Sequence, residues 1–300
     1  MTARSAHVDS FAGDNLPSRE QWPDLIFTLP ELNYPERLNA ATEFVDRWIV
    51  AGAGDRPCLI TPSANLSYAQ LGELVNRIAN VLTRDLELVP GNRVLLRAPN
   101  SPMMVACHMA VLKAGGIVVA TMPLLRAKEL SYPIAKAKIE LALCDTRLAD
   151  ELEKAAAGGL KQIVYWGNGG PGGLEALMAQ PGYEIFEPCD TASDDLCLIA
   201  FTSGTTGVPK GTMHCHRDLL AICDSYGRHV LRADREDRFI GSPPLAFTFG
   251  LGGLVLFPLH IGASTVLLER ASPDELIKAV EKYRATVCFT APTAIAPCSC

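Results

Sequence analysis

A run of hydroxyl residues, glycines and one lysine follows an apolar segment near the middle of the chain. The run is FTSGTTGVPKG, residues 201–211, and it comes directly after LCLIA. Hydroxyl groups and unobstructed backbone N–H groups donate hydrogen bonds to phosphate oxygens, and a lysine adds a positive charge that those oxygens favour. We therefore expect this loop to bind phosphate groups.

The position of the lysine separates this loop from the P-loop of common ATPases. That pattern requires a lysine between a glycine and a serine or threonine, whereas Lys210 follows Pro209 and precedes Gly211. A P-loop hydrolase is therefore disfavoured. A simple polar turn is the other alternative. It does not explain why so many hydroxyl residues and glycines gather at the end of one strand.

Strands and helices alternate around the loop. The apolar runs RVLLRA, IVVATM, LALCD, QIVYW and LCLIAF predict strands, and the segments between them have helical spacing. Ser67 is the predicted N-cap of a helix that begins near Tyr68. This alternation indicates an α/β fold with helix-covered, mainly parallel sheets, in which ligands bind at the carboxyl ends of the strands.

The chain divides by composition into four parts. Residues 1–55 form an N-terminal segment, 56–192 a first α/β subdomain, and 193–294 a second α/β subdomain that carries the phosphate loop. Residues 295–300 form a separate tail.

Composition disfavours several classes of protein. Lys+Arg 27 against Asp+Glu 33 gives a net charge of −6 without a basic block, so nucleic-acid binding is disfavoured. The N-terminus lacks the apolar core of a signal peptide, and the longest nearly uncharged stretch, 251–268, is interrupted by glycines and Pro258. The ten cysteines are scattered, several of them in strand-like runs, which favours reduced thiols in a cytoplasmic protein.

Two further motifs are interpreted without a ligand-binding role. HCHRD, residues 214–218, contains metal-ligand types, but adjacent ligands on one short stretch rarely converge on one ion, and no CxxC accompanies them. We therefore assign no metal-binding residue. The glycine-rich GNGGPGG, residues 167–173, contains no lysine and is interpreted as a surface connection rather than a nucleotide loop.

The phosphate loop resembles the signature of the adenylate-forming superfamily, which comprises acyl- and aryl-CoA synthetases, luciferases and peptide-synthetase adenylation domains. Four more segments are similar to elements of that family: LSYAQL (66–71), VLKAGGIVVATMP (111–123), SPPLAFTFGLGG (242–253) and ATVCFTAPTA (285–294). The resemblance covers about residues 50–295. It implies an incomplete version of the family's N-terminal domain, with two stacked, helix-covered, mainly parallel sheets.

The resemblance also implies a two-step reaction with ATP, Mg²⁺ and coenzyme A. A carboxylate attacks the α-phosphorus of ATP, and a thiol then displaces AMP to form a thioester. The side chains expected to contact the triphosphate are Thr202, Ser203, Thr205, Thr206 and Lys210. Gly204 and Gly207 give backbone access, and Thr206 and Lys210 are the expected catalytic residues because charge neutralisation dominates reactions at phosphorus.

The acid pocket is expected at Phe247, Thr248, Phe249 and Gly250. Two aromatic side chains suit a ring-bearing acid, although one of them could equally belong to the core. The segment is similar to benzoate-type CoA ligases, and the string MPLLRAKEL (122–130) is similar to 2-aminobenzoate-CoA ligases. We expect 2-aminobenzoate as substrate, with benzoate or hydroxybenzoate as alternatives.

Two other functions remain open at this point. The chain could load an activated acid onto a carrier protein, or it could be a remnant that binds nucleotide without turnover. The family's chain is nearly twice as long, and its later tyrosine–glycine–threonine–glutamate element, ribose-binding aspartate, hinge and C-terminal lysine have no counterpart here. Relatives commonly continue after the PTA of residues 292–294 with a different sequence from IAPCSC, so we hypothesise that residues 295–300 are a frameshifted tail.

Overall fold

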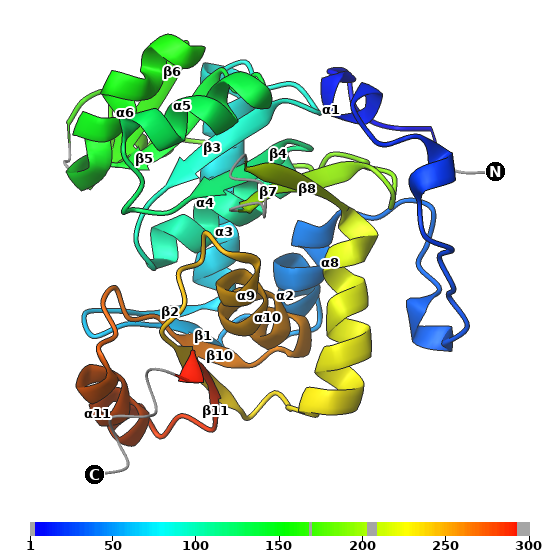
Figure 1. The fold of residues 1–300 in the computed structure, drawn as a ribbon. Helices are drawn as coiled ribbons and strands as arrows, with labels where there is room; N and C mark the ends of the chain where they lie inside the picture. The colour runs from blue at the N-terminus through cyan, green and yellow to red at the C-terminus, as the bar shows by residue number, and fades with distance from the viewer. Residues whose placement is uncertain (1–3, 168–169, 203–208, 293–300) are drawn as a thin grey trace.

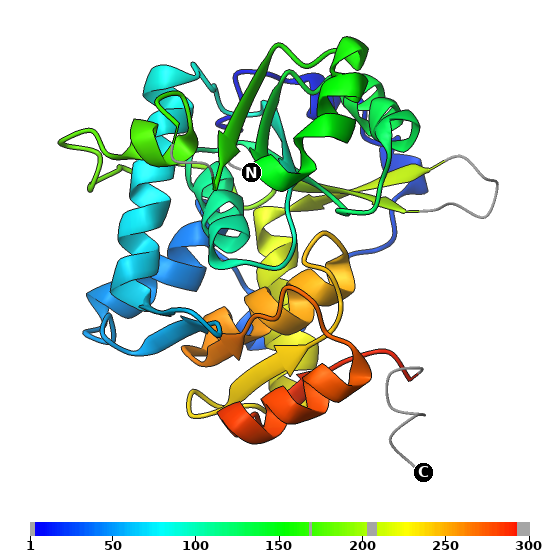
Figure 2. The same cartoon turned by 90° about the vertical axis from the view of Figure 1, so that its left-hand side faces the viewer.

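The computed structural model describes residues 4–167, 170–202 and 209–292. It contains two mainly parallel sheets flanked by helices, which confirms the α/β fold expected from the sequence. The larger sheet lies in the upper half of Figure 1 and the smaller one in the lower half. Figure 2 shows the same two parts from the side.

The larger sheet has six strands and includes the strand before the phosphate loop. In spatial order its strands are β6 (Gln162–Trp166), β5 (Leu141–Asp145), β3 (Arg93–Arg97), β4 (Ile117–Thr121), β7 (Leu196–Thr202) and β8 (Lys210–Cys215). All neighbours run parallel except β7 and β8. The central strand β3 is buried along its whole length, as expected for a sheet with both faces covered.

The smaller sheet joins strands from distant parts of the chain. Its order is β11 (Val287–Phe289), β9 (Arg238–Gly241), β10 (Ser264–Val266), β1 (Pro57–Ile60) and β2 (Asn65–Ser67). Sheet membership therefore cuts across the division proposed at residue 192, because β1 and β2 join β9–β11 whereas β7 and β8 join the larger sheet. The boundaries at 55, 192 and 294 stay predictions.

Helices cover and separate the two sheets. The α-helices are α1 (Phe11–Asp14), α2 (Arg47–Val50), α3 (Tyr68–Asn80), α4 (Pro102–Lys113), α5 (Ala127–Lys136), α6 (Ala149–Ala155), α7 (Leu174–Met178), α8 (His216–Ile222), α9 (Thr248–Leu251), α10 (Phe257–Ile261) and α11 (Pro273–Tyr283). The π-helical segments are η3 (Thr42–Asp46), η4 (Val81–Asp85), η7 (Cys223–Leu231) and η8 (Gly252–Leu256). Four 3₁₀ turns complete the described elements: η1 (Arg19–Gln21), η2 (Pro30–Leu32), η5 (Thr146–Leu148) and η6 (Ala156–Gly158).

Local sequence explains where the long helices begin. Ser67 caps α3 by accepting a hydrogen bond from the Gln70 backbone N–H, and the Gln70 side chain accepts one from the Ser67 N–H. This reciprocal pair satisfies two N–H groups that a helix start otherwise leaves unpaired. Helix α4 has apolar residues all round and is buried from Met104 to Lys113, as a helix within the core must be.

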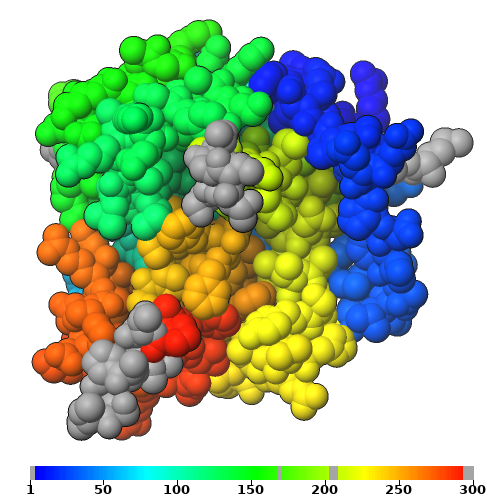
Figure 3. All heavy atoms as spheres, in the orientation of Figure 1, coloured from blue at the N-terminus to red at the C-terminus, as the bar shows by residue number. Residues whose placement is uncertain are grey.

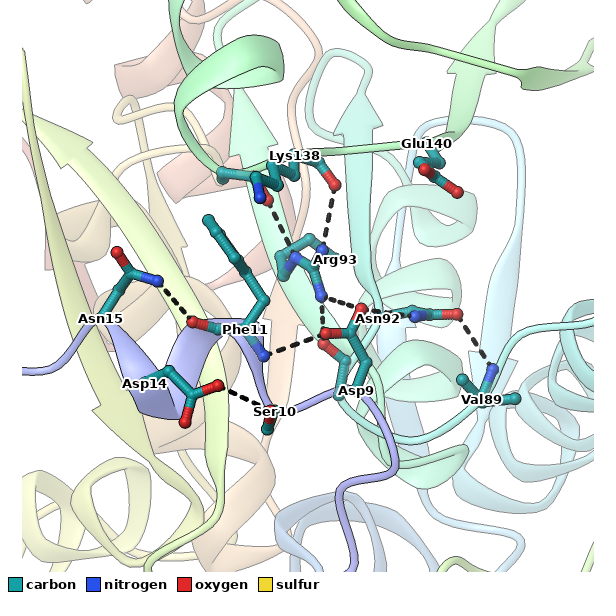
Figure 4. A network of polar contacts seen from close by, with 12 residues as sticks. Asp9, Ser10, Phe11, Asp14, Asn15, Val89, Asn92, Arg93, Lys138 and Glu140 are labelled. Atoms are coloured by element: carbon teal, nitrogen blue, oxygen red, sulfur yellow. Dashed lines mark hydrogen bonds and ion pairs between the residues drawn. The ribbon is translucent and has the colours of Figure 1, made fainter.

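Polar and cation–π contacts join the N-terminal segment to the start of β3, as Figure 4 shows. Asp9 accepts hydrogen bonds from the buried Arg93 at 2.5 Å and from Asn92 at 2.9 Å. The Arg93 guanidinium lies 5.0 Å from the Phe11 ring centroid, and the Lys138 ammonium lies 4.6 Å from it. The contacts hold residues 9–11 against the larger sheet.

The uncharged stretch 251–268 folds into the end of α9, η8, α10 and β10. Gly262 ends α10 with a φ of +73°, and a Cβ there would lie 3.2 Å from the Trp48 ring. None of the helices in the three described ranges combines the length and the apolar character that crossing a bilayer requires.

Candidate functional site

The phosphate loop connects two antiparallel strands, β7 and β8. Thr202 pairs with Lys210, and Phe201 pairs with Gly211. The intervening residues Ser203, Gly204, Thr205, Thr206, Gly207 and Val208 lie outside the described residues. Their assigned roles therefore stay predictions, while the base of the loop is well defined by the strand pairing.

Strand β8 was missed by sequence reasoning, which predicted no strand directly after the phosphate loop. The segment KGTMHC has a glycine and few β-branched residues, so its local signal for a strand is weak. Pairing with the apolar β7 creates the strand. A side chain at Gly211 would be crowded, since a Cβ there would lie 3.0 Å from Ile199 and 3.4 Å from the Phe201 ring.

A cleft of about 710 Å³ opens beside the base of the loop. Thr202 and Pro209 line it from the hairpin, Thr121 from the carboxyl end of β4, and Phe247 from the N-cap of α9. Its volume lies within the range of small-molecule sites. The cleft thus lies at the carboxyl ends of parallel strands, where open α/β sheets bind ligands.

The predicted acid segment divides between two environments. Phe247 is 44% exposed and lines the cleft. Phe249 is 51% exposed, does not line this cleft, and packs edge-on against Phe289 with ring centroids 5.7 Å apart. Neither phenylalanine belongs to the buried core, so the core alternative is wrong for both. Thr248, at the start of α9, is also exposed.

Gly250 is required by a close approach of two backbone segments. A Cβ at this position would lie 2.1 Å from the Pro244 carbonyl oxygen. The glycine therefore lets α9 begin directly against the preceding turn, which brings Phe247 to the edge of the cleft. This role is structural, and the part of Gly250 in the acid pocket stays a prediction.

Helix α5 contributes residues that sequence reasoning did not assign to the site. Lys128 and Tyr132 are four residues apart, and both line the cleft. The Tyr132 ring meets Phe201 edge-on, with centroids 6.2 Å apart. Glu129 also lines the cleft, but one of its carboxylate oxygens accepts a 2.7 Å hydrogen bond from the Arg126 N–H. The four-residue spacing of Lys128 and Tyr132, which places both on one face of a helix, is the sequence feature that could have linked them to one site.

The histidines of HCHRD have separate surroundings. His216 is buried, and its Nδ1 accepts a hydrogen bond from the Ala40 N–H at 3.1 Å. Burial lowers the pKa of His216 to about 3. The His214 ring lies 3.2 Å from the Thr212 hydroxyl. Within residues 4–167, 170–202 and 209–292, no three metal-ligating side chains are grouped closely enough to hold a metal ion.

Comparison with known proteins relates this site to enzymes that bind AMP. The sequence matches the family of AMP-binding enzymes over residues 46–298. A benzoate–CoA ligase from Thauera aromatica is 31% identical over 271 residues, which cover 89% of this chain and 51% of that protein. A 4-hydroxybenzoate–CoA/benzoate–CoA ligase from Rhodopseudomonas palustris is 30% identical over 260 residues, which cover 85% of this chain and 48% of that protein.

A solved structure agrees with the fold. The crystal structure of the anthranilate CoA ligase AuaEII in complex with anthranoyl-AMP superposes with a TM-score of 0.83 at 27% identity, covering 89% of this chain and 52% of that chain. The chain therefore spans about half the length of these relatives. Taken with the match over residues 46–298 and the two helix-covered sheets, this shows that the chain belongs to the AMP-binding enzyme family.

Proposed function

We propose that this chain is the ATP-binding and acid-binding part of an enzyme that joins an aromatic carboxylic acid to coenzyme A. The observation that carries the proposal is the cleft that connects the base of the phosphate loop to Phe247. A triphosphate beside Thr202 and an acid beside Phe247 would share one cavity, as the transfer of a carboxylate oxygen to phosphorus requires.

The first step of the proposed reaction forms an acyl-adenylate. A carboxylate oxygen attacks the α-phosphorus of ATP, the bond to the bridging oxygen breaks, and pyrophosphate leaves. Lys210 lies at the start of β8 with an exposed side chain, and it would neutralise negative charge on the phosphates. Hydroxyls of the loop, Thr206 foremost, would donate hydrogen bonds, with Gly204 and Gly207 giving backbone access.

Mg²⁺ would be held mainly by the phosphates in this proposal. Glu129 is a carboxylate among the described residues that line the cleft, and one of its oxygens is engaged with the Arg126 N–H. The described walls therefore do not supply an all-protein magnesium site, which agrees with the preference of this ion for phosphate and water ligands.

In the second step of the proposed reaction, the sulfur of coenzyme A attacks the acyl carbon and AMP leaves.

The proposed acid is a benzoate, and 2-aminobenzoate is the specific candidate. The benzoate–CoA ligase and hydroxybenzoate–CoA ligase relatives support the benzoate class. The similarity to an anthranilate CoA ligase supports the 2-amino derivative. Phe247 offers an aromatic face for a ring in the cleft.

A binding and turnover experiment tests the proposal. Binding of ATP to the 300-residue chain is measured by calorimetry, and pyrophosphate release is followed with benzoate, 4-hydroxybenzoate or 2-aminobenzoate, each with and without coenzyme A. Lys210→Ala should weaken ATP binding by about tenfold or more, since a hydrogen bond to a charged group contributes about 1.5–3 kcal/mol. Lys161→Ala, which removes an exposed lysine paired with Glu140, is the matched control.

Each result has a distinct meaning. Nucleotide binding without pyrophosphate release supports the binding remnant. Pyrophosphate release that coenzyme A does not stimulate supports the carrier-loading alternative. No ATP binding by the chain, or equal binding by Lys210→Ala and the wild type, would refute the assignment of the loop.

A further inference from the structure

A second cavity lies away from the cleft, between the N-terminal segment, η7 and α10. Its volume is about 690 Å³, which also suits a small molecule. Tyr34, Trp48, Arg228 and His260 line it, and none of these residues lines the cleft beside the phosphate loop. In Figure 1, this part of the molecule is where blue α2 lies beside the long yellow helix that comprises α8 and η7.

The central carboxylate of this cavity is already engaged within the protein. Asp224 Oδ2 accepts a hydrogen bond from the Tyr34 hydroxyl at 2.9 Å, and Oδ1 lies 2.9 Å from His260 Nε2. Burial raises the pKa of Asp224, but the hydrogen bonds from His260 and Tyr34 and the charge of Arg228 outweigh it, so this pKa lies below its ordinary value. Asp224 is therefore ionised, and both of its oxygens have partners.

The arginines of the cavity outnumber the carboxylates that could neutralise them. Glu43 forms an ion pair with Arg47 at 3.5 Å. Arg228 and Arg232 also line the cavity, and neither forms an ion pair with any residue that the structure describes. Arg232 donates one hydrogen bond, from Nε to the His229 carbonyl oxygen at 3.0 Å. Arg228 and Arg232 thus line the cavity without a carboxylate in ion-pair contact, although the charge of Arg228 also stabilises the ionised Asp224.

The remaining walls provide an aromatic surface and an unusual backbone. The Trp48 ring lines the cavity, and its Nε1 donates a 2.7 Å hydrogen bond to the Leu259 carbonyl oxygen, which fixes the ring. Leu38 and Pro35 add apolar surface beside it. Two of the walls come from or adjoin the π-helical segments η3 and η7. Such segments are rare, and they often occur at functional sites.

We propose that this cavity binds a small organic phosphate. A phosphoryl group carries three acceptor oxygens and a charge of about −1.5 to −2 at pH 7, whereas a carboxylate carries two oxygens and a single charge, so the phosphoryl group better matches two arginines that no described carboxylate contacts. The guanidinium fork also matches phosphate oxygens geometrically. A cavity of about 690 Å³ leaves room for an organic body beside the apolar wall of Pro35 and Leu38 and the exposed part of Trp48. The proposal does not depend on the function proposed for the cleft.

Tryptophan fluorescence gives a local test, because Trp48 belongs to the cavity. The chain is titrated with phenyl phosphate, inorganic phosphate and benzoate at constant ionic strength. We expect phenyl phosphate to change the fluorescence saturably. Inorganic phosphate should bind more weakly because it lacks the ring, and benzoate should bind more weakly because it lacks the phosphoryl group. Trp48→Phe should abolish the signal. The double variant Arg228→Gln/Arg232→Gln should weaken binding at least about tenfold.

Arg235, three residues after Arg232, provides a matched control. Arg235 is exposed and does not line the cavity, so Arg235→Gln should change the affinity less than twofold. Circular dichroism shows whether each variant is folded. The proposal is overturned if phenyl phosphate causes no saturable change, if the signal persists in Trp48→Phe, or if the double variant binds like Arg235→Gln. Benzoate that binds as tightly as phenyl phosphate would overturn the phosphate class.

Discussion

Two buried histidines should make the fold sensitive to mild acid. His108 lies within the apolar helix α4, and His216 begins α8 near Asp195 and His7; both histidines are buried. Their Nε2 atoms have no hydrogen-bond partner among the described residues. Burial lowers the pKa of His108 from 6.5 to about 4 and that of His216 from 6.5 to about 3. Both side chains are therefore neutral in the folded chain at pH 5.5.

The size of the effect follows from proton linkage. Below pH 6.5 the unfolded chain binds a proton at each histidine, while the folded chain does not, so the free energy of unfolding falls as the pH falls. Between pH 7.5 and pH 5.5 each histidine lowers the free energy of unfolding by about 1.36 kcal/mol, and the two together lower it by about 2.7 kcal/mol. Since both folded-state pKa values lie well below 5.5, this loss depends little on where they lie.

Urea denaturation at the two pH values measures the loss. His108→Leu should keep the neutral-pH stability nearly unchanged and reduce the acid-induced loss by about 1.4 kcal/mol. His216→Gln keeps an oxygen that accepts the hydrogen bond from the Ala40 N–H and should reduce the loss by a similar amount. His214→Gln, on β8 and only partly buried, is the control and should leave the loss unchanged. The reasoning is refuted if the double variant loses as much stability in acid as the wild type, because carboxylate titration is common to both.

Three further predictions concern packing and capping. Gly250→Ala should lower the free energy of unfolding by about 1–3 kcal/mol, since its Cβ would lie 2.1 Å from the Pro244 carbonyl oxygen, and Gly172→Ala, with open space around it, is the control in the same denaturation assay. Ser67→Ala should cost about 1 kcal/mol through loss of the α3 cap, and an unchanged denaturation midpoint would contradict that role. Asp9→Asn should weaken the contact with the buried Arg93 and speed proteolysis of the N-terminal segment, whereas cleavage at the wild-type rate would show that this ion pair does not hold it.

Local sequence was sufficient to predict the elements that depend on near neighbours. The cap at Ser67, the strand before the phosphate loop and the alternating α/β order all rest on interactions between residues close in the chain. The family resemblance also rested on contiguous motifs, and the match over residues 46–298 confirms it. These features need no knowledge of distant partners, because capping residues and apolar spacing act over a few positions.

Tertiary structure alone decided which distant segments meet. The parallel pairing of β1 with β10 joins Leu59 to Thr265 across most of the chain, and no local pattern distinguishes that partner from another apolar strand. Strand β8 exists because β7 pairs with it, and Phe247 and Phe249 diverge because α9 turns between them. The cavity that joins Trp48 to Arg228 likewise depends on packing between helices far apart in sequence. Burial of complementary surfaces selects these contacts, and that selection is visible only once the chain is folded.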